Sequence, residues 1–223
     1  IDMSGVNSYK DGVIAGLHKG LQGLVKSRNI TYVEGTGLLV SNNTVDVNGT
    51  AYVGKNIVLA TGAWSKNLAS QLGHNIPLQA ERGYHLSLKN ASHMPPNTYL
   101  ITDKKFGLTP MDGFLRCAGQ SEFAPLEMPP NPKAIKNLRK FLFRLYPKLE
   151  YETETIWQGT RPTLPDSLPV IGRSSKNTSV IFAFGGQHLG LTMGPKIGKM
   201  VRDIIFERQS NVNMTPYSSD RFD

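Results

Sequence analysis

The residues best suited to chemistry lie in two segments near the C-terminal end of the sequence. The first runs from Trp157 to Gly172 and places Arg161 between Gly159-Thr160 and Pro162. A guanidinium group offers a planar fork of donors that matches a carboxylate, and the flanking glycine and proline indicate a fixed, proline-rich loop. The segment therefore suits the binding of an anionic substrate. The alternative is that Arg161 pairs with Asp166 and only braces the loop.

The second segment runs from Phe184 to Thr192 and opens an amphipathic helix. Its glycines let the backbone approach a flat ring closely, and a helix that starts near Leu189 directs its positive end to the same place. Such a helix end favours a bound group that carries negative charge. The alternative is a glycine-rich helix start needed only for packing. His188, inside this turn, could line the substrate side or simply cap the turn.

A third candidate is the end of a strand at Ala60-Thr61-Gly62. Ligands of open α/β sheets bind outside the carboxyl ends of strands, and small residues there allow a cofactor to approach. The alternative is an ordinary tight turn between a strand and a helix.

Hydrophobic periodicity predicts the elements that must position these residues. Helices are expected at 8–27, 65–72, 135–146 and 191–206. Strands are expected at 29–33, 38–40, 44–47, 50–53, 55–60, 84–88, 98–101, 106–110, 114–119 and 180–184. Asn48-Gly49 and Met111-Asp112-Gly113 are expected to form turns. The order of these elements indicates an α/β (α+β) fold in which an antiparallel-sheet domain is inserted into a nucleotide-binding domain.

The same order predicts the domain boundaries. Residues 1–75 and 155–208 are expected to form parts of the nucleotide-binding domain, and residues 76–154 the inserted substrate domain. The polar tail, 209–223, is expected to lie loosely along the surface.

These segments carry a resemblance to a known family. From Gly62 to the C-terminus the chain resembles the FAD-dependent D-amino-acid dehydrogenases and glycine oxidases of the DAO family. Besides the two segments above, the resemblance rests on Glu81-Arg82-Gly83-Tyr84-His85 and on the stretch from Pro216 to Phe222. The stretch from Val58 to Ser65 is similar to the second FAD-contacting strand and turn of two-dinucleotide-type flavoproteins.

Residues 1–61 are more similar to another flavoprotein, dihydrolipoamide dehydrogenase. Three segments carry this similarity: Tyr9-Lys10-Asp11-Gly12-Val13, Tyr32-Val33-Glu34-Gly35-Thr36-Gly37 and the stretch from Lys55 to Gly62. In both families this region lines the binding site for the adenosine of FAD. Either resemblance therefore implies the same cofactor.

The resemblance implies a partial FAD-binding Rossmann-like domain and specific roles for residues. FAD would be contacted by Gly35, Gly37, Ala60, Thr61, Gly62, Trp64, Gly159, Gly185, Gly186, Leu189, Gly190, Leu191 and Thr192. Arg161 would bind the α-carboxylate of the substrate, and His188 is the other candidate catalytic residue. The pocket wall would include Tyr84, His85, Phe106 and His188. The implied reaction is hydride transfer to the flavin from a D-amino acid or related amine, followed by hydrolysis of the imine.

One departure from both families is serious. Each begins with a strand, a Gly-x-Gly-x-x-Gly turn and a helix that hold the pyrophosphate, and no such motif occurs in this sequence. The alternative function is therefore a catalytically silent FAD-domain module, which needs a preceding segment or a partner chain that carries the fingerprint. The sequence leaves open whether oxygen, a quinone or another electron acceptor, such as an iron–sulfur partner, takes the electrons.

Composition excludes several other classes. The single cysteine, Cys117, permits no intrachain disulfide and no cysteine-based zinc site, and no metal-ligand spacing stands out. A reducing, cytoplasmic location is expected, with attachment to the inner face of the membrane as the alternative. The net charge of +8 comes without a nucleic-acid motif. Its densest basic cluster reads as a solvated helix face or as a site for an acidic partner or anionic membrane surface: Lys133, Lys136, Arg139, Lys140, Arg144 and Lys148.

Overall fold

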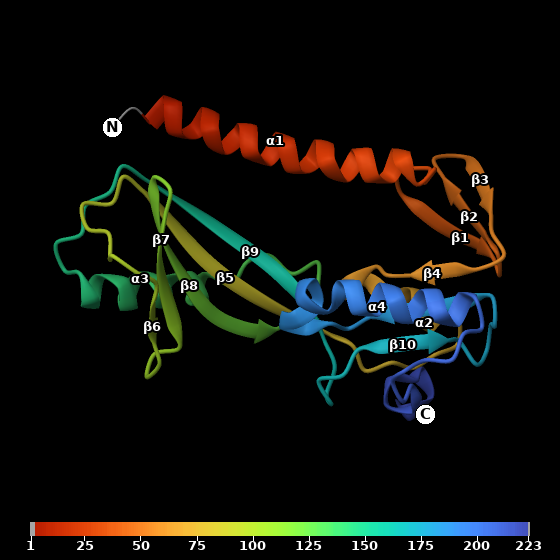
Figure 1. Ribbon diagram of the computed structural model, residues 1–223. Coiled ribbons are helices and arrows are strands. Elements are labelled where there is room, and N and C mark those ends of the chain that lie inside the picture. Colours follow the sequence, from red (N-terminus) through yellow and green to blue (C-terminus); the bar gives the residue numbers. More distant parts are fainter. Residues whose placement is uncertain (1–2, 223) are drawn as a thin grey trace.

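The computed structural model describes residues 3–222, with the side chains of residues 3–11, Ile14 and Leu17 left undescribed. Two lobes lie end to end, and a long helix, α1 (Met3–Ser27), runs beside both (Figure 1). The large-sheet lobe contains strands β5–β9 and helix α3. The small-sheet lobe contains β4, β10, β11, α2 and α4.

The large-sheet lobe is a five-stranded antiparallel sheet with strand order β6-β7-β8-β5-β9. Its strands are β5 (Gln79–Lys89), β6 (Tyr99–Ile101), β7 (Phe106–Met111), β8 (Phe114–Phe123) and β9 (Thr153–Thr163). Helix α3 (Pro132–Leu145) begins at Asn131, whose side chain accepts a hydrogen bond from the Lys133 amide. Its apolar stripe, with Leu138 and Leu142 wholly buried, covers one face of the sheet.

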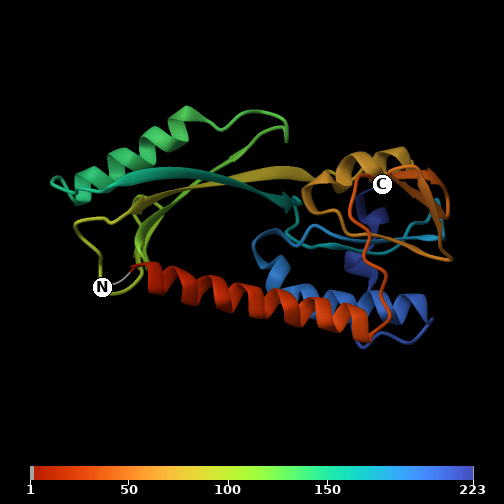
Figure 2. The ribbon, with the colours of Figure 1, turned by 90° about the horizontal axis from the view of Figure 1, so that it is seen from above.

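The alternation of side chains along β5 divides this sheet into two unlike faces. Tyr84, Leu86 and Leu88 pack toward α3 in the core. Glu81, Gly83 and His85 must therefore point to the opposite face, and Figure 2 shows α1 on that side of the sheet, with α3 on the other. The face opposite α3 is called the open face below.

The small-sheet lobe has the strand order β10-β11-β4. Strands β4 (Ile57–Leu59) and β11 (Val180–Phe184) are parallel, while β10 (Val170–Arg173) is antiparallel to β11. Helices α2 (Ser65–Gln71) and α4 (Gly190–Ile205) belong to this lobe. The predicted strand at 55–60 is present, but Val58 is 40% exposed, so that β4 is buried on one face only. Within the described residues β4 is an edge strand.

The remaining strands form a small sheet of their own with the order β1-β2-β3. They are β1 (Gly37–Ser41), β2 (Thr44–Val47) and β3 (Thr50–Val53), and the predicted Asn48-Gly49 hairpin joins the last two. Asn48 has φ 53° and Gly49 φ 84°, as this kind of turn requires.

Three expectations are wrong. Residues 29–33 form no strand, because no neighbouring strand pairs with them. The segment around Arg161 is not a loop: β9 pairs with β5 from Thr153 opposite Lys89 to Thr163 opposite Gln79. Pro162 is tolerated there because β9 is an edge strand of the described sheet.

The third error concerns the C-terminal tail. Val212, Met214 and Tyr217 pack against the core between β10, β11 and α4, and Phe222 packs against the neighbouring core. Arg221 Nε donates to Asp166 Oδ2 over 2.6 Å. Apolar residues spaced along a polar segment hold the tail to the small-sheet lobe, where composition alone suggested a loose segment. No described helix combines the length and the apolar character needed to cross a membrane.

Candidate active site

Arg161 lies on the open face of the large sheet, near the end of β9 that adjoins the small-sheet lobe. In the β5–β9 ladder it stands opposite Glu81, and Gly159 stands opposite Gly83. Directly opposed residues of an antiparallel pair share a face, so Arg161, Glu81 and the two glycines form one patch.

The guanidinium of Arg161 lies across Gly83. A Cβ atom added to Gly83 would be 2.6 Å from Arg161 Nη1, so a larger residue would displace the group. Nη1 is buried and makes no hydrogen bond within the described part of the chain. Its nearest acidic atom is Glu81 Oε1, at 3.6 Å, beyond hydrogen-bonding distance. Arg161 therefore keeps unused donor capacity in a partly shielded position.

Glu81 is the second charged residue of this patch and is only 8% exposed. Its Oε2 accepts a hydrogen bond from the Thr163 hydroxyl over 2.9 Å, and His188 Nε2 lies 3.2 Å from its Oε1. Burial opposes the ionisation of the Glu81 carboxyl. The Thr163 hydrogen bond, the charge of His188, a hydrogen bond from the Ser121 side chain and the charge of Arg161 together outweigh burial, and the pKa of Glu81 lies below its ordinary value. Glu81 is therefore an ionised, buried carboxylate.

The contact between Glu81 and His188 joins the open face to the glycine-rich turn before α4. His188 lies in the 3₁₀ turn Gln187–Leu189, and its side chain is 56% exposed. Gly185, at φ 86°, and Gly186 precede this turn, and an added Cβ on Gly186 would be 2.8 Å from Gly190 Cα. The close packing of two glycines sets the direction in which α4 starts.

A groove of about 420 Å³ begins beside this turn. Its walls come from the ends of β4 and β11, from the first three turns of α4 and from Pro162, the residue after Arg161. Gly62, at φ 56°, and Gly190 and Gly194 have open space where a side chain would be. The groove is lined mostly by glycines and apolar side chains and therefore suits a flat, largely apolar group.

The structure places five of the expected cofactor residues on this groove: Ala60, Gly62, Gly185, Gly186 and Gly190. The others lie outside its lining: Gly35, Gly37, Thr61, Trp64, Gly159, Leu189, Leu191 and Thr192. Gly35 and Gly37 belong to the β1–β3 region, where added side chains would meet Asn48 and Val45. Trp64, Leu189 and Leu191 are exposed, Leu191 to 96%.

Gly159 leaves space for the side chain of Trp157. The Trp157 indole lies over it, so that an added Cβ would clash with the ring, and the indole stacks on His85 with centroids 4.8 Å apart. Burial, and to a lesser extent the charge of Arg116, lower the pKa of His85, which favours a neutral ring. His85 and Trp157 thus extend the open face as an aromatic wall.

Two expected wall residues lie elsewhere. Tyr84 and Phe106 are each 3% exposed and belong to the core between the sheet and α3. In the ladders both share a face with Gly119, which is the face turned away from Arg161. Because one step along a strand reverses the side-chain direction, His85 reaches the open face and Tyr84 does not.

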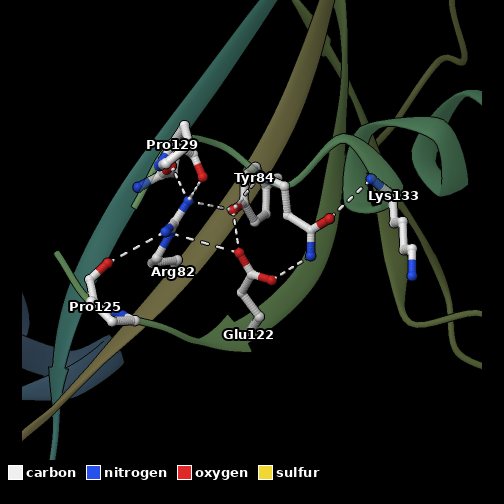
Figure 3. Close-up of polar contacts among 8 residues, drawn as sticks. Arg82, Tyr84, Glu122, Pro125, Pro129 and Lys133 are labelled. Carbon is white, nitrogen blue, oxygen red and sulfur yellow. Dashed lines mark hydrogen bonds and ion pairs between the residues drawn. The ribbon is translucent and has the colours of Figure 1, made fainter. Parts of the chain in front are cut away.

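Tyr84 instead belongs to a buried polar network centred on Arg82 (Figure 3). Arg82 is fully buried, and its Nη2 donates to Tyr84 Oη, to Gln158 Oε1 and to the Pro129 carbonyl. Tyr84 donates to Glu122 Oε1 over 2.5 Å. The network ties β5, β8 and β9 to the segment that leads into α3, directly behind Glu81.

Comparisons with known proteins identify the family of this chain. The model of the family described as FAD dependent oxidoreductase (DAO) matches residues 8–204. The match includes most of the segment that resembled dihydrolipoamide dehydrogenase. A D-amino-acid oxidase of Bradyrhizobium diazoefficiens is 33% identical over 206 residues, which is 89% of this chain and 49% of that protein. The chain therefore belongs to the family of FAD-dependent oxidoreductases.

Solved structures agree on the fold. The chain is similar to a glycine oxidase from Geobacillus kaustophilus, with a TM-score of 0.65, 19% identity and coverage of 82% of this chain and 50% of that chain. It is equally similar to an L-proline dehydrogenase from P. horikoshii, with a TM-score of 0.65, 20% identity and coverage of 86% and 53%. The chain thus spans about half the length of the relatives that it matches.

The family's cofactor, FAD, fits part of this site. The groove lies next to the start of α4, and its glycines leave open space in which the flat isoalloxazine ring can lie against the backbone. The Gly-x-Gly-x-x-Gly turn that holds a pyrophosphate does not occur in these 223 residues. The described residues are therefore suited to the ring end of FAD.

Sequence reasoning missed the importance of Glu81, Gly83 and Arg82. The signal was an acidic and a basic residue in adjacent positions of a segment that otherwise reads as a strand. Strand alternation predicts that one of the two points into a core, where a charge must find a partner. What the pattern could not supply was the register that sets Glu81 opposite Arg161.

Proposed function

We propose that this chain forms the substrate-binding portion of a flavoenzyme that oxidatively deaminates a D-amino acid or a related amine. One observation carries the proposal: Arg161 holds a buried, unused donor over Gly83, and the adjacent Glu81 contacts His188. His188 lies in the turn that begins at Gln187, one of the residues that line the groove suited to the flavin. A carboxylate bound to Arg161 would therefore hold its α-carbon near the mouth of that groove.

In this proposal the two lobes divide the work. The small-sheet lobe, together with residues 1–56, is the FAD-binding part. The large-sheet lobe is the substrate-binding part. Strand β9 lies at the boundary, so its residues can contact both the substrate and the FAD-binding part. FAD, when bound, accepts a hydride from the α-carbon, while this chain's residues supply orientation and electrostatics.

The roles of the residues follow from their positions. Arg161 binds the α-carboxylate through a planar pair of donors. His188 and the aromatic pair His85–Trp157 border the substrate and limit the access of water. The positive end of α4 lies at the groove and stabilises negative charge that develops there.

Replacement of Arg161 tests the proposal. In the flavin-loaded protein, Arg161→Ala should lower kcat/KM for D-amino acids by roughly hundredfold or more, because charge-assisted hydrogen bonds to a carboxylate are lost. The kcat/KM of Arg161→Lys should lie between those of the unaltered protein and Arg161→Ala, since lysine keeps the positive charge but lacks the planar pair of donors. Steady-state kinetics and anaerobic bleaching of the flavin band measure both.

Arg139→Ala is the matched control, because Arg139 pairs with Glu154 on the opposite face of the sheet. Unchanged turnover of every carboxylate-bearing substrate by Arg161→Ala would remove Arg161 from the site. Oxygen uptake compared with quinone reduction would identify the electron acceptor.

A catalytically silent module is the second candidate function. It is favoured by the missing pyrophosphate motif and by the exposed edge of β4. The two candidates are separated in a protein that also supplies the Gly-x-Gly-x-x-Gly turn, in the same chain or in a partner. Bleaching of its flavin band by a D-amino acid supports the first candidate, and a flavin band that no D-amino acid or amine bleaches supports the second.

A further inference from the structure

The carboxylate of Glu81 occupies a position that the role of Arg161 leaves unexplained. It is almost completely buried, yet the guanidinium beside it stays 3.6 Å away, too far for a hydrogen bond. A buried carboxylate costs free energy unless charges or donors compensate it. At 3.6 Å the two charges attract each other, while Arg161 Nη1 keeps a hydrogen-bond donor for a third group.

Its neighbours leave part of this carboxylate available to a ligand. Oε2 accepts a hydrogen bond from the Thr163 hydroxyl, and Oε1 forms a hydrogen bond with Nε2 of the partly exposed His188. The Ser121 side chain also forms a hydrogen bond with the carboxylate. Each carboxylate oxygen has two lone pairs, so Oε1 can accept a hydrogen bond from a ligand as well. Oε1 is also the oxygen nearer to both residues that border the substrate in the proposed function.

The charges of the patch favour one class of ligand. Arg161 carries one positive charge and Glu81 one negative charge, so this pair is neutral as a whole. A simple carboxylate would bring an uncompensated negative charge close to Glu81. A zwitterion matches both groups, because its carboxylate and its amino group are only two bonds apart through the α-carbon.

We propose that Glu81 recognises the amino group of the substrate, so that the Arg161–Glu81 pair reads the two ends of an α-amino acid. This inference rests on the proposed function and deepens it. Glu81 accepts a hydrogen bond from the substrate nitrogen, and Arg161 donates to its carboxylate.

The same position would assist the reaction. The bond between the α-carbon and its hydrogen breaks, and the electron pair leaves as hydride toward FAD. The bound ammonium first loses one proton to solvent water. The lone pair of the resulting neutral amine then becomes the second bond of C=N, and the nitrogen acquires a positive charge. A fixed carboxylate stabilises that developing charge more than it stabilises the neutral amine, which accelerates the step.

Two ligands that differ only in the amino group test the proposal. 2-Aminoisobutyrate has no α-hydrogen and cannot be oxidised in this way, and isobutyrate lacks the amino group. Calorimetry on the flavin-loaded protein should give tighter binding of 2-aminoisobutyrate. Glu81→Gln should reduce this preference by about tenfold or more, because an acceptor that carries a charge becomes neutral. With D-alanine, the same variant should lower kcat more than it raises KM.

Glu154→Gln is the control, since it makes the same change on the opposite face of β9. If Glu81→Gln does not fold, Glu81→Asp retracts the carboxylate by one methylene and should also reduce the preference. Equal weakening of both ligands would mean that Glu81 only braces Arg161, and an unchanged preference would remove Glu81 from recognition. Either result overturns the inference and leaves the proposed function standing. If the unaltered protein binds neither ligand and D-amino acids do not bleach its flavin, the proposed function fails as well.

Discussion

At the scale of single residues, glycines decide where the charged and aromatic side chains of the site can lie. Gly83 makes room for the Arg161 guanidinium, and Gly159 makes room for the Trp157 indole. Both lie on the open face, in strands where a glycine weakens packing and therefore has a local reason. The open face is thus shaped by missing side chains as much as by those present.

Gly83→Ala should displace Arg161 without unfolding the protein. The new Cβ would lie 2.6 Å from Nη1, and the flexible end of the arginine would give way. A displacement of about 1 Å can cost on the order of hundredfold in catalysis, and we expect a similar loss of kcat/KM for D-amino acids.

Gly107→Ala is the matched control, because its added Cβ would make an ordinary 3.7 Å contact with the Tyr99 carbonyl oxygen. Thermal denaturation should show both variants folded. Full activity of Gly83→Ala would mean that the position of Arg161 does not matter.

At the scale of elements, two polar connections hold segments that hydrophobic patterning leaves undetermined. The network around Arg82 fastens the segment 124–131 and the start of α3 to the large sheet. Arg221 fastens the C-terminal tail to the loop before β10 through Asp166 and the Leu168 carbonyl. The first connection centres on the fully buried Arg82, whereas the carboxylate of the second, Asp166, is partly exposed and can be protonated from solution.

The Asp166–Arg221 pair should make stability depend on pH. The hydrogen bond from Arg221 lowers the pKa of Asp166 from its ordinary value of 3.8, although partial burial opposes this. A carboxyl with a lowered folded-state pKa stabilises the fold above its unfolded pKa, and this stability is lost as pH falls through the folded pKa. Asp166→Asn should therefore lower Tm by about 2–4 °C at pH 6, for a contribution of about 1 kcal/mol.

The difference in Tm between the two proteins should shrink below about pH 4. Asp112→Asn, in the exposed turn between β7 and β8, serves as the control. A difference that stays constant down to pH 3 would show that the Asp166 carboxylate does not act through its charge.

At the scale of the whole molecule, apolar surface remains uncovered within the described residues. Helix α1 packs closely on no other described element, and Leu21 and Leu24 are 63% and 57% exposed. A cavity of about 690 Å³ lies between α1 and the segment around Tyr32. An exposed apolar patch of this kind is typical of a surface that binds another segment, a partner or a ligand.

The 223-residue chain expressed by itself should therefore bind the dye ANS and retain no flavin. Without the pyrophosphate contacts the affinity for FAD falls, since each hydrogen bond to a charged group contributes roughly 1.5–3 kcal/mol to binding. A protein that also supplies a strand, a Gly-x-Gly-x-x-Gly turn and a helix, in the same chain or in a partner, should be yellow and bind less dye.

Visible absorption and dye fluorescence measure the two properties on the same samples. A yellow 223-residue chain with no dye binding would contradict this account. Such a result would mean that FAD needs only the groove between β4, β11 and α4.

Local patterns in the sequence were sufficient for most elements. Periodicity and turn residues indicated the helices, the Asn48-Gly49 hairpin and the two strands that become β4 and β11, because these signals depend on near neighbours in the chain. Arg161 and the glycine-rich turn at Gly185 could be singled out for the same reason. The family, and with it the cofactor, could also be recognised from these segments.

Only the tertiary structure decided which residues meet. The register of β5 and β9 sets Glu81 beside Arg161, sends Tyr84 to the opposite face and turns a proline-containing segment into an edge strand. Pairing between strands about 80 positions apart depends on the energy of the whole sheet, and a shift of one residue would reverse every side chain. The sequence by itself therefore determined the chemistry available to this protein, while the sheet register decided which of those groups share a face.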